Sequence, residues 1–258
     1  MSDTEIWQFR KWKAKGVVRH LWDQTFLIEY WRRIYMTSRF LYFTRVRDRL
    51  RTLARGDSVA ENTISHNLKG MRDLSVVRSD ALVKPLSVIE CLDAKSKVLC
   101  VGPRTEGELY NLAAHGFTLA NIRGLDLISY SPMIDLGDMH AMPYPEETWD
   151  AVVCGWVLAY SDAKQRAADE LVRVCKDGGV IAVGVEYNPR SVETVARERG
   201  YVPGSVERIT TLAQLLSLFE GSIEHVYFSQ EPTDQRRDQL GSITAIFSVR
   251  KRARPSSP

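Results

Sequence analysis

Residues 97–109 read Lys97-Val-Leu-Cys-Val-Gly-Pro-Arg-Thr-Glu-Gly-Glu-Leu109, and they contain the clearest indication of the fold class. It begins with a short apolar run that ends at Gly102 and continues into a segment with helical spacing over residues 106–115. An apolar strand, a glycine turn and a helix in this order form the start of a βαβ unit. We therefore expect a parallel sheet to begin here.

The same alternation continues downstream. Strand-like apolar runs recur in three places: residues 122–126, 149–155 and 180–186. A helical pattern over residues 163–175 comes before the last run, and Asp177-Gly178-Gly179 is expected to end that helix. Two further strand-like segments, 224–230 and 242–249, are separated only by a polar loop and are most simply antiparallel neighbours. The pattern predicts an α/β fold with a doubly wound, mostly parallel sheet and a C-terminal antiparallel hairpin.

One connection is unusually short. Only 11 residues separate Asp126, at the end of a predicted strand, from Asp138. That length is too small for a full crossover helix plus a further strand. We therefore expect residues 127–132 to cross as an extended loop.

The N-terminal part has a different composition. The 258-residue chain has a formal charge of +3, yet residues 1–60 hold 13 Lys/Arg and 6 Asp/Glu, so the remaining residues are net acidic. Aromatic residues are concentrated in the first 43 positions, and residues 4–54 have a pattern typical of two or three helices. We predict a helical N-terminal extension over residues 1–94, an α/β domain over residues 95–250 and a disordered tail over residues 251–258.

Composition excludes several classes of protein. Apolar residues make up 44% of the chain and charged residues 26%, as in ordinary globular domains, and no apolar stretch approaches the roughly 18 residues of a membrane span. The four cysteines are widely spaced without a Cys-x-x-Cys pair, so no metal site is expected. The first residues show no secretory pattern, and we expect a cytoplasmic protein.

Three stretches carry a resemblance to a known family. They are residues 97–109, residues 137–153 (Gly137-Asp-Met-His-Ala-Met-Pro-Tyr-Pro-Glu-Glu-Thr-Trp-Asp-Ala-Val-Val153) and residues 170–181 (Glu170-Leu-Val-Arg-Val-Cys-Lys-Asp-Gly-Gly-Val-Ile181). Together they resemble the class I S-adenosylmethionine-dependent methyltransferases. The resemblance implies a Rossmann-like sheet of seven strands, S-adenosylmethionine as cofactor and methyltransferase activity.

The resemblance also implies which residues bind the cofactor. Asp126 corresponds to the carboxylate that accepts the ribose hydroxyls. Asp138, with the Met139 backbone, corresponds to the adenine contact. Gly102 lets the backbone approach the ligand, and Gly155 ends the strand beside it.

The first motif departs from the family pattern. The family's Asp-x-Gly-x-Gly-x-Gly reads here as Cys100-Val-Gly102-Pro-Arg104-Thr-Glu106, so the leading acid and two glycines are replaced. Arg104 could pair with the carboxylate of the donor while Glu106 binds its amino group. Alternatively, these two bulky side chains close the pocket.

Methyl transfer to a weak nucleophile such as a hydroxyl requires a base. His140, Tyr160 and Glu186 follow strands at the edge where open α/β sheets bind their ligands, and they are the catalytic candidates. We expect transfer of a methyl group to an oxygen or nitrogen of a small molecule or glycan. The alternative is a non-catalytic methyltransferase-like binding or scaffolding protein with a degenerate cofactor motif.

The basic, aromatic N-terminal region admits several roles. It could form a lid over the substrate, a homodimer surface, or a weak contact with a membrane surface, because basic amphipathic helices rich in Trp bind there. Nucleic-acid binding is the least favoured role, because a packed core also needs these aromatic residues.

Overall fold

The computed structural model describes residues 29–53, 68, 79–199 and 207–251. Within these residues a seven-stranded sheet has the order β5-β3-β2-β6-β7-β9-β8. The parallel strands are β2 (Val98–Val101), β3 (Ile122–Asp126), β5 (Ile134–Leu136), β6 (Trp149–Gly155) and β7 (Cys175–Tyr187). The antiparallel hairpin consists of β8 (Ile223–Gln230) and β9 (Gly241–Val249), and β9 pairs with β7. The predicted fold class is confirmed.

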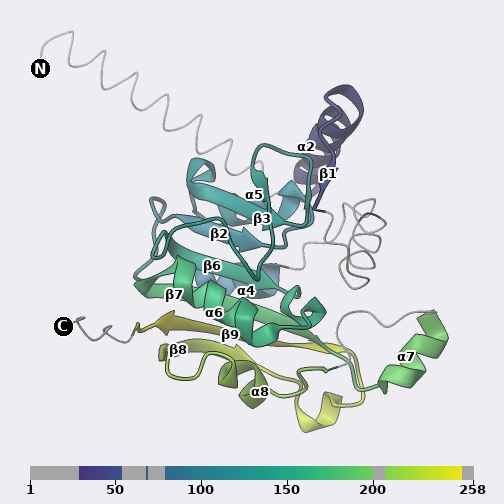
Figure 1. The fold of residues 1–258 in the computed structure, drawn as a ribbon, viewed down its shortest axis with the longest axis vertical. Helices are drawn as coiled ribbons and strands as arrows, with labels where there is room; N and C mark the ends of the chain where they lie inside the picture. The colour runs from purple at the N-terminus through teal and green to yellow at the C-terminus, as the bar shows by residue number, and fades with distance from the viewer. Residues whose placement is uncertain (1–28, 54–67, 69–78, 200–206, 252–258) are drawn as a thin grey trace, which may run out of the picture.

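Helices cover both faces of the sheet (Figure 1). On one face α6 (Lys164–Val174) and α8 (Leu212–Ser217) pack on alternate strand residues such as Leu99 and Val152. On the other face α4 (Asp80–Leu86) and α5 (Glu106–Ala114) pack on the intervening residues. All four residues of β2 are therefore buried, which explains why its sequence is uniformly apolar.

Shorter elements complete the connections. They are three 3₁₀ helices, η2 (Leu119–Asn121), η3 (Leu158–Tyr160) and η4 (Asp234–Arg236), and one α-helix, α7 (Val192–Arg199). No helix within the described residues is both long enough and apolar enough to cross a membrane.

The short connection after β3 differs from a plain loop. Residues 127–133 contain a two-residue strand, β4 (Ile128–Ser129), which pairs antiparallel with β1 (Arg51–Thr52) of the N-terminal region. Leu53 N also donates to Leu127 O at 2.8 Å. The segment does cross without a helix, but its backbone groups are satisfied by a strand that lies far away in the sequence.

The helix expected over residues 163–175 is shorter than predicted. It ends at Val174, and Cys175 already begins β7. Asp177-Gly178-Gly179 therefore does not stop the helix but lies inside the strand, where Gly178 has a φ of +70° and the register with β6 shifts between Trp149 and Ala151. The glycines permit a bulge that joins helix and strand without a loop.

The N-terminal region packs on the α/β domain. Its described part consists of α2 (Glu29–Leu41), the π-helix η1 (Tyr42–Val46) and β1. In Figure 1, α2 stands beside α5 at the end of the molecule away from the hairpin. The helices predicted before residue 29 and most of those predicted between residues 54 and 78 lie outside the described residues, as do residues 252–258 of the predicted disordered tail.

Candidate functional site

The register of the sheet brings the ends of three strands to one edge. Val101 pairs with Leu125 of β3 and with Cys154 of β6, so the residues that follow them, Asp126 and Gly155, lie beside Gly102. Gly102 N donates to Leu125 O at 2.7 Å. Gly102 has a φ of +69°, a left-handed conformation that favours glycine.

Asp126 is a buried carboxylate at this edge. Its side-chain oxygens accept hydrogen bonds from Arg104 N and Ile128 N, each at 3.0 Å. Burial raises the pKa of the Asp126 carboxyl to about 6, and the two backbone donors oppose this rise. A carboxylate has about four acceptor positions, and the Leu127 backbone also interacts with Asp126, so the carboxylate keeps an acceptor position for a further hydrogen bond.

Asp138 and His140 lie together in the loop after β5. Asp138 Oδ1 lies 2.7 Å from His140 Nδ1 and 3.1 Å from His140 N, and His140 Nε2 lies 2.6 Å from Ser161 Oγ. Both ring nitrogens of His140 are within hydrogen-bond distance of a side-chain oxygen: Nδ1 lies next to Asp138, and Nε2 lies next to Ser161. His140 therefore links the loop after β5 to the segment before α6.

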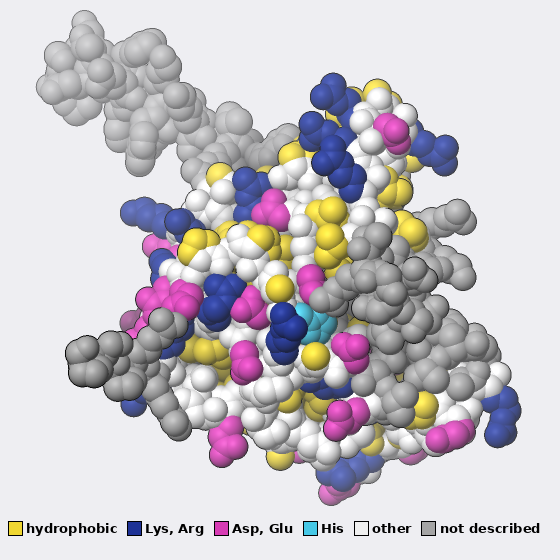
Figure 2. Space-filling view, in the orientation of Figure 1, with side chains coloured by type: hydrophobic (Ala, Val, Ile, Leu, Met, Phe, Trp, Pro, Cys, Tyr) yellow, Lys and Arg dark blue, Asp and Glu magenta, His cyan; other side chains and the backbone are white. Residues whose placement is uncertain are grey.

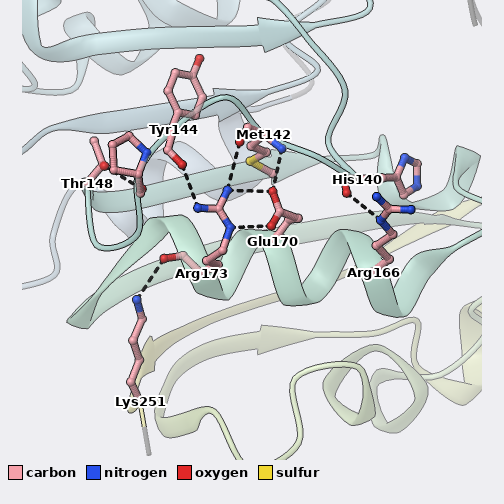
Figure 3. Close-up of polar contacts among 9 residues, drawn as sticks. His140, Met142, Tyr144, Thr148, Arg166, Glu170, Arg173 and Lys251 are labelled. Atoms are coloured by element: carbon pink, nitrogen blue, oxygen red, sulfur yellow. Dashed lines mark hydrogen bonds and ion pairs between the residues drawn. The ribbon is translucent and has the colours of Figure 1, made fainter. Parts of the chain in front are cut away.

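Helix α6 holds the backbone of the same loop (Figure 3). Arg166 Nε donates to His140 O at 2.9 Å, and Glu170 Oε2 accepts from Met142 N at 2.6 Å. Arg173 donates to Met142 O at 3.0 Å and to Tyr144 O at 2.8 Å, and it forms an ion pair with Glu170. The hydrogen bond from Arg173 holds the pKa of Glu170 below its usual value. This network fixes the path of residues 140–144.

The first motif is tied to the N-terminal helix. Glu106, fully buried, accepts from Arg39 Nε at 2.6 Å and from Arg39 Nη2 at 2.7 Å, and it also accepts from the Ser131 hydroxyl. The hydrogen bond that Arg39 donates to Glu106 raises the pKa of the Arg39 guanidinium above its usual range. Glu106 N donates to Tyr130 Oη at 2.9 Å. This placement argues against a role for Glu106 at the amino group of a ligand.

The space next to the glycine turn is occupied. A Cβ built on Gly102 would lie 2.1 Å from Cγ1 of Val157, in the segment that follows β6. Packing of Val157 therefore accounts for glycine at this position. At Gly155, by contrast, a Cβ would meet Leu82 Cδ1 at 3.5 Å, an ordinary contact, so packing does not require glycine there.

The remaining predicted residues lie around the same edge. Met139 and Tyr160 are half-buried, and Glu186 is exposed near the end of β7. Arg104 is half-buried, with a φ of +51° in the turn. Within the described residues, no group of three or more His, Cys, Asp or Glu side chains could hold a metal ion.

Sequence reasoning missed several residues that shape this site. Glu170 and Arg173 belong to the stretch 170–181 that resembles the family, but the sequence alone predicts no role for their side chains. Arg39 and Val157 give no signal in the sequence, and Ser161 indicates only a helix cap, because the partners of these residues are far away in the sequence: Glu106 is 67 positions from Arg39 and His140 is 21 positions from Ser161.

Comparison with known proteins identifies the domain. Residues 99–183 match the family model described as a methyltransferase domain. No curated protein matches the sequence significantly. Residues 99–183 therefore have the sequence pattern of a methyltransferase domain, in agreement with the resemblance to the class I S-adenosylmethionine-dependent methyltransferases.

Solved structures share the fold. One is from the complex between the Haloferax volcanii Trm112 methyltransferase activator and a methyltransferase, with a TM-score of 0.52, 17% identity and coverage of 76% of this chain and 97% of that chain. A second is an S-adenosylmethionine-dependent methyltransferase from Mesorhizobium loti, with a TM-score of 0.48, 16% identity and coverage of 64% and 95%. At 17% identity, the first likeness establishes the fold alone.

The residues present fit part of the donor. The buried Asp126 carboxylate, which keeps an acceptor position beside its backbone donors, has the chemistry to accept a hydrogen bond from a ribose hydroxyl. Asp138 lies on the same edge, one residue after Gly137, whose N donates to Asp126 O at 3.0 Å. At the methionine end, Cys100 stands where the family has its leading acid, and Glu106 forms an ion pair with Arg39.

Proposed function

We propose that this protein is a methyltransferase that binds S-adenosylmethionine at the carboxyl edge of its sheet and methylates an oxygen or nitrogen of a small molecule or glycan. The observation that carries the proposal is the Asp126 carboxylate. It is buried beside the Gly102 turn, and its hydrogen-bond partners are backbone N–H groups. A desolvated carboxylate in such a place gains from ligand hydroxyl donors.

Each cofactor role follows from the position of its residue. Asp126 would accept the ribose hydroxyls, while Asp138 and the Met139 backbone would hold the adenine. Gly155, where packing leaves room, would allow close approach of the ligand. Arg104, in the turn next to Asp126, would pair with the donor carboxylate. Glu106 would act through Arg39, as the anchor of α2.

The donor supplies a sulfonium methyl group that is already activated for displacement. The chain therefore contributes mainly alignment of the acceptor and removal of water. As the acceptor atom bonds to the methyl carbon, the carbon–sulfur bond breaks and the acceptor loses its proton. For a hydroxyl acceptor, the exposed Glu186 and the half-buried Tyr160 are the proposed proton acceptors. His140, with both ring nitrogens bonded to side chains, would position the loop.

Calorimetric titration tests the cofactor site. Wild-type protein is expected to bind S-adenosylmethionine and its demethylated product, and Asp126→Ala to lose that binding. Asp150→Ala is the matched control, because Asp150 lies at the other end of β6 and pairs with Lys176. Absence of binding to either ligand by the wild type would overturn the proposal.

A second experiment addresses the acceptor. Purified protein and methyl-labelled donor are incubated with fractionated cell extract, and label is followed in small-molecule and glycan fractions. If the protein binds the donor but label appears in neither fraction, the result would contradict the proposed methyl transfer and support a role in binding only.

A further inference from the structure

Helix α2 has two apolar faces, and the α/β domain uses only one of them. On the inner face, Met36 and Phe43 are buried, and Phe40 stacks edge-to-face on Tyr130 at a centroid distance of 5.1 Å. A Cβ on Gly107 of α5 would lie 2.3 Å from Met36 Cε, so the two helices are in close contact. The inner face is thus fully occupied.

The outer face carries an exposed apolar stripe. Tyr30 is 67% exposed, Trp31 is 52% exposed, and the stripe continues to Val46, at 71%. We call it the outer ridge; its members are Tyr30, Trp31, Ile34, Leu41, Tyr42, Val46 and Leu50. These seven are the majority of the eleven large hydrophobic side chains exposed in the described part of the chain. Such concentration marks an interaction surface, whereas isolated exposed side chains are normal.

The outer ridge is also strongly basic. Four exposed arginines, Arg45, Arg47, Arg49 and Arg51, lie in the sequence around its C-terminal half, and the only acidic residue among them is Asp48; the guanidinium of Arg49 lies over the ring of Phe43 at 5.9 Å. Figure 2 shows Lys and Arg side chains gathered on the end of the molecule where α2 stands in Figure 1. A partner must therefore cover apolar surface and neutralise positive charge at the same time.

These two requirements favour one kind of partner. A second copy of the chain bound through the same face would bring the arginines of both copies together, at an electrostatic cost. Phosphates of a nucleic acid would neutralise the arginines but would leave Trp31, Ile34 and Leu41 in water. The interface of an anionic bilayer offers both, because Trp and Tyr settle at headgroup level and Arg pairs with lipid phosphate.

We propose that the outer ridge binds the surface of an anionic lipid bilayer and places this protein on a membrane as a peripheral protein. The α2 helix would lie along the headgroups with its outer face inserted, while its inner face stays on α5. The proposal is independent of the methyl donor and of the acceptor.

Vesicle sedimentation of the full-length protein tests the proposal. The expected result is binding to vesicles of phosphatidylglycerol and phosphatidylcholine, at least tenfold tighter than to phosphatidylcholine alone, and weakened by salt. The double variant Trp31→Ser/Ile34→Ser should lose about tenfold in affinity, and Arg45→Gln/Arg47→Gln should lose the preference for anionic vesicles. Tyr227→Ser is the matched control, because Tyr227 is 43% exposed on β8, outside the ridge.

Three results would overturn the proposal. The first is no binding of the wild type to anionic vesicles at low salt. The second is equal binding by the wild type and the Trp31→Ser/Ile34→Ser variant. The third is a lipid-free dimer, measured by light scattering, that this variant converts to a monomer, because a second copy would then occupy the ridge. A melting temperature equal to that of the wild type verifies that each variant is folded.

Discussion

The buried Asp126 carboxylate, which is proposed to bind the donor, lowers the stability of the folded protein when it is ionised. In the unfolded chain its carboxyl has the ordinary pKa of 3.8, whereas in the native state burial raises the pKa to about 6. Between these values the native state binds more protons than the unfolded state, so the contribution of Asp126 to stability falls as the pH rises from about 4 to about 6. Above pH 6 the ionised carboxylate costs about 3 kcal/mol.

Replacement of Asp126 by Asn is therefore expected to separate stability from binding. Asp126→Asn removes the ionisable group, so at pH 7 the free energy of unfolding should stay within about 1 kcal/mol of wild type or rise. The affinity for S-adenosylmethionine should fall at least tenfold, because the amide has only one acceptor oxygen. Urea titration measures the first quantity and calorimetry the second; a large loss of stability with unchanged affinity would contradict this interpretation.

The same carboxyl predicts how donor binding depends on pH. Ligand hydroxyls stabilise the ionised form of Asp126, so bound donor should lower its pKa. Affinity should therefore be constant above about pH 6 and weaken as the pH falls through 6. Calorimetric titrations at roughly pH 5 to 8, below and above the pKa of Asp126, measure how the affinity for the donor depends on pH. If Asp126→Asn still binds the donor, its affinity should not decrease as the pH falls through 6. A decrease that persists in this variant would show that another group causes the pH dependence.

Arg39 and Glu106 form the second residue-level determinant. Removal of the guanidinium leaves the fully buried Glu106 without its counter-charge, and such losses cost about 3–5 kcal/mol. Arg39→Met should therefore destabilise strongly, while the double variant Arg39→Met/Glu106→Gln should recover most of the loss because no buried charge remains. Lys84→Met, in an exposed pair with Asp80, is the control and should cost less than about 1 kcal/mol. Urea titration of the wild type, Arg39→Met, Glu106→Gln and the double variant measures the coupling between the two residues; additive losses of the two single variants would contradict this expectation.

At the scale of elements, side chains of α6 hold the loop that carries Asp138 by hydrogen bonds to its backbone. Arg173→Met removes two donors to backbone carbonyls and leaves Glu170 without its ion pair, so we expect a loss of about 2–3 kcal/mol. Because the loop position depends on these hydrogen bonds, donor affinity should also fall, although Arg173 contacts no ligand group in the proposal. Lys176→Met is the control, because Lys176 pairs with Asp150 at the opposite end of β6. This variant should change the free energy of unfolding and the donor affinity only slightly. Lower stability with unchanged donor affinity would show that the loop is held by other contacts.

The elements that could be predicted from the sequence are those whose own residues show the pattern of a strand or helix. Residues of β2 and β6 are buried on both faces, so their apolar runs stand out without knowledge of their neighbours. The strand pair β1–β4 could not be predicted, because each strand has two residues and its partner lies more than 70 positions away. Gly178 and Gly179 were read as a helix stop, although the structure uses them as a bulge inside β7, since glycine permits either conformation.

The same distinction holds within the candidate site. The positions of Asp126 and Gly102 at strand ends were predictable, because a strand end is visible in the sequence. The commitment of Glu106 to Arg39 was not, because the partner comes from a helix 67 residues earlier. The bridge from His140 to Ser161 likewise depends on where two loops meet in space.

At the scale of the whole molecule, the N-terminal region contacts the edge of the sheet proposed to bind the methyl donor (the donor edge) at two points. Arg39 of α2 holds Glu106 in the first motif, and β1 pairs with β4 directly after Asp126. Tyr130 connects the two, because its ring packs on Phe40 and its hydroxyl accepts from Glu106 N. Any ligand that orders Asp126 and the Gly102 turn should therefore also order α2 and β1.

Hydrogen exchange followed by mass spectrometry measures this coupling. S-adenosylmethionine should slow exchange of backbone amides at the Gly102 turn and, although no direct contact is proposed, also in α2 and β1. The β8–β9 hairpin lies at the opposite end of the sheet and is the internal control, with no change expected. In Arg39→Met/Glu106→Gln the protection of α2 should disappear while that of the turn remains. Protection of the turn alone in the wild type would mean that the N-terminal region is attached to the donor edge without being coupled to it.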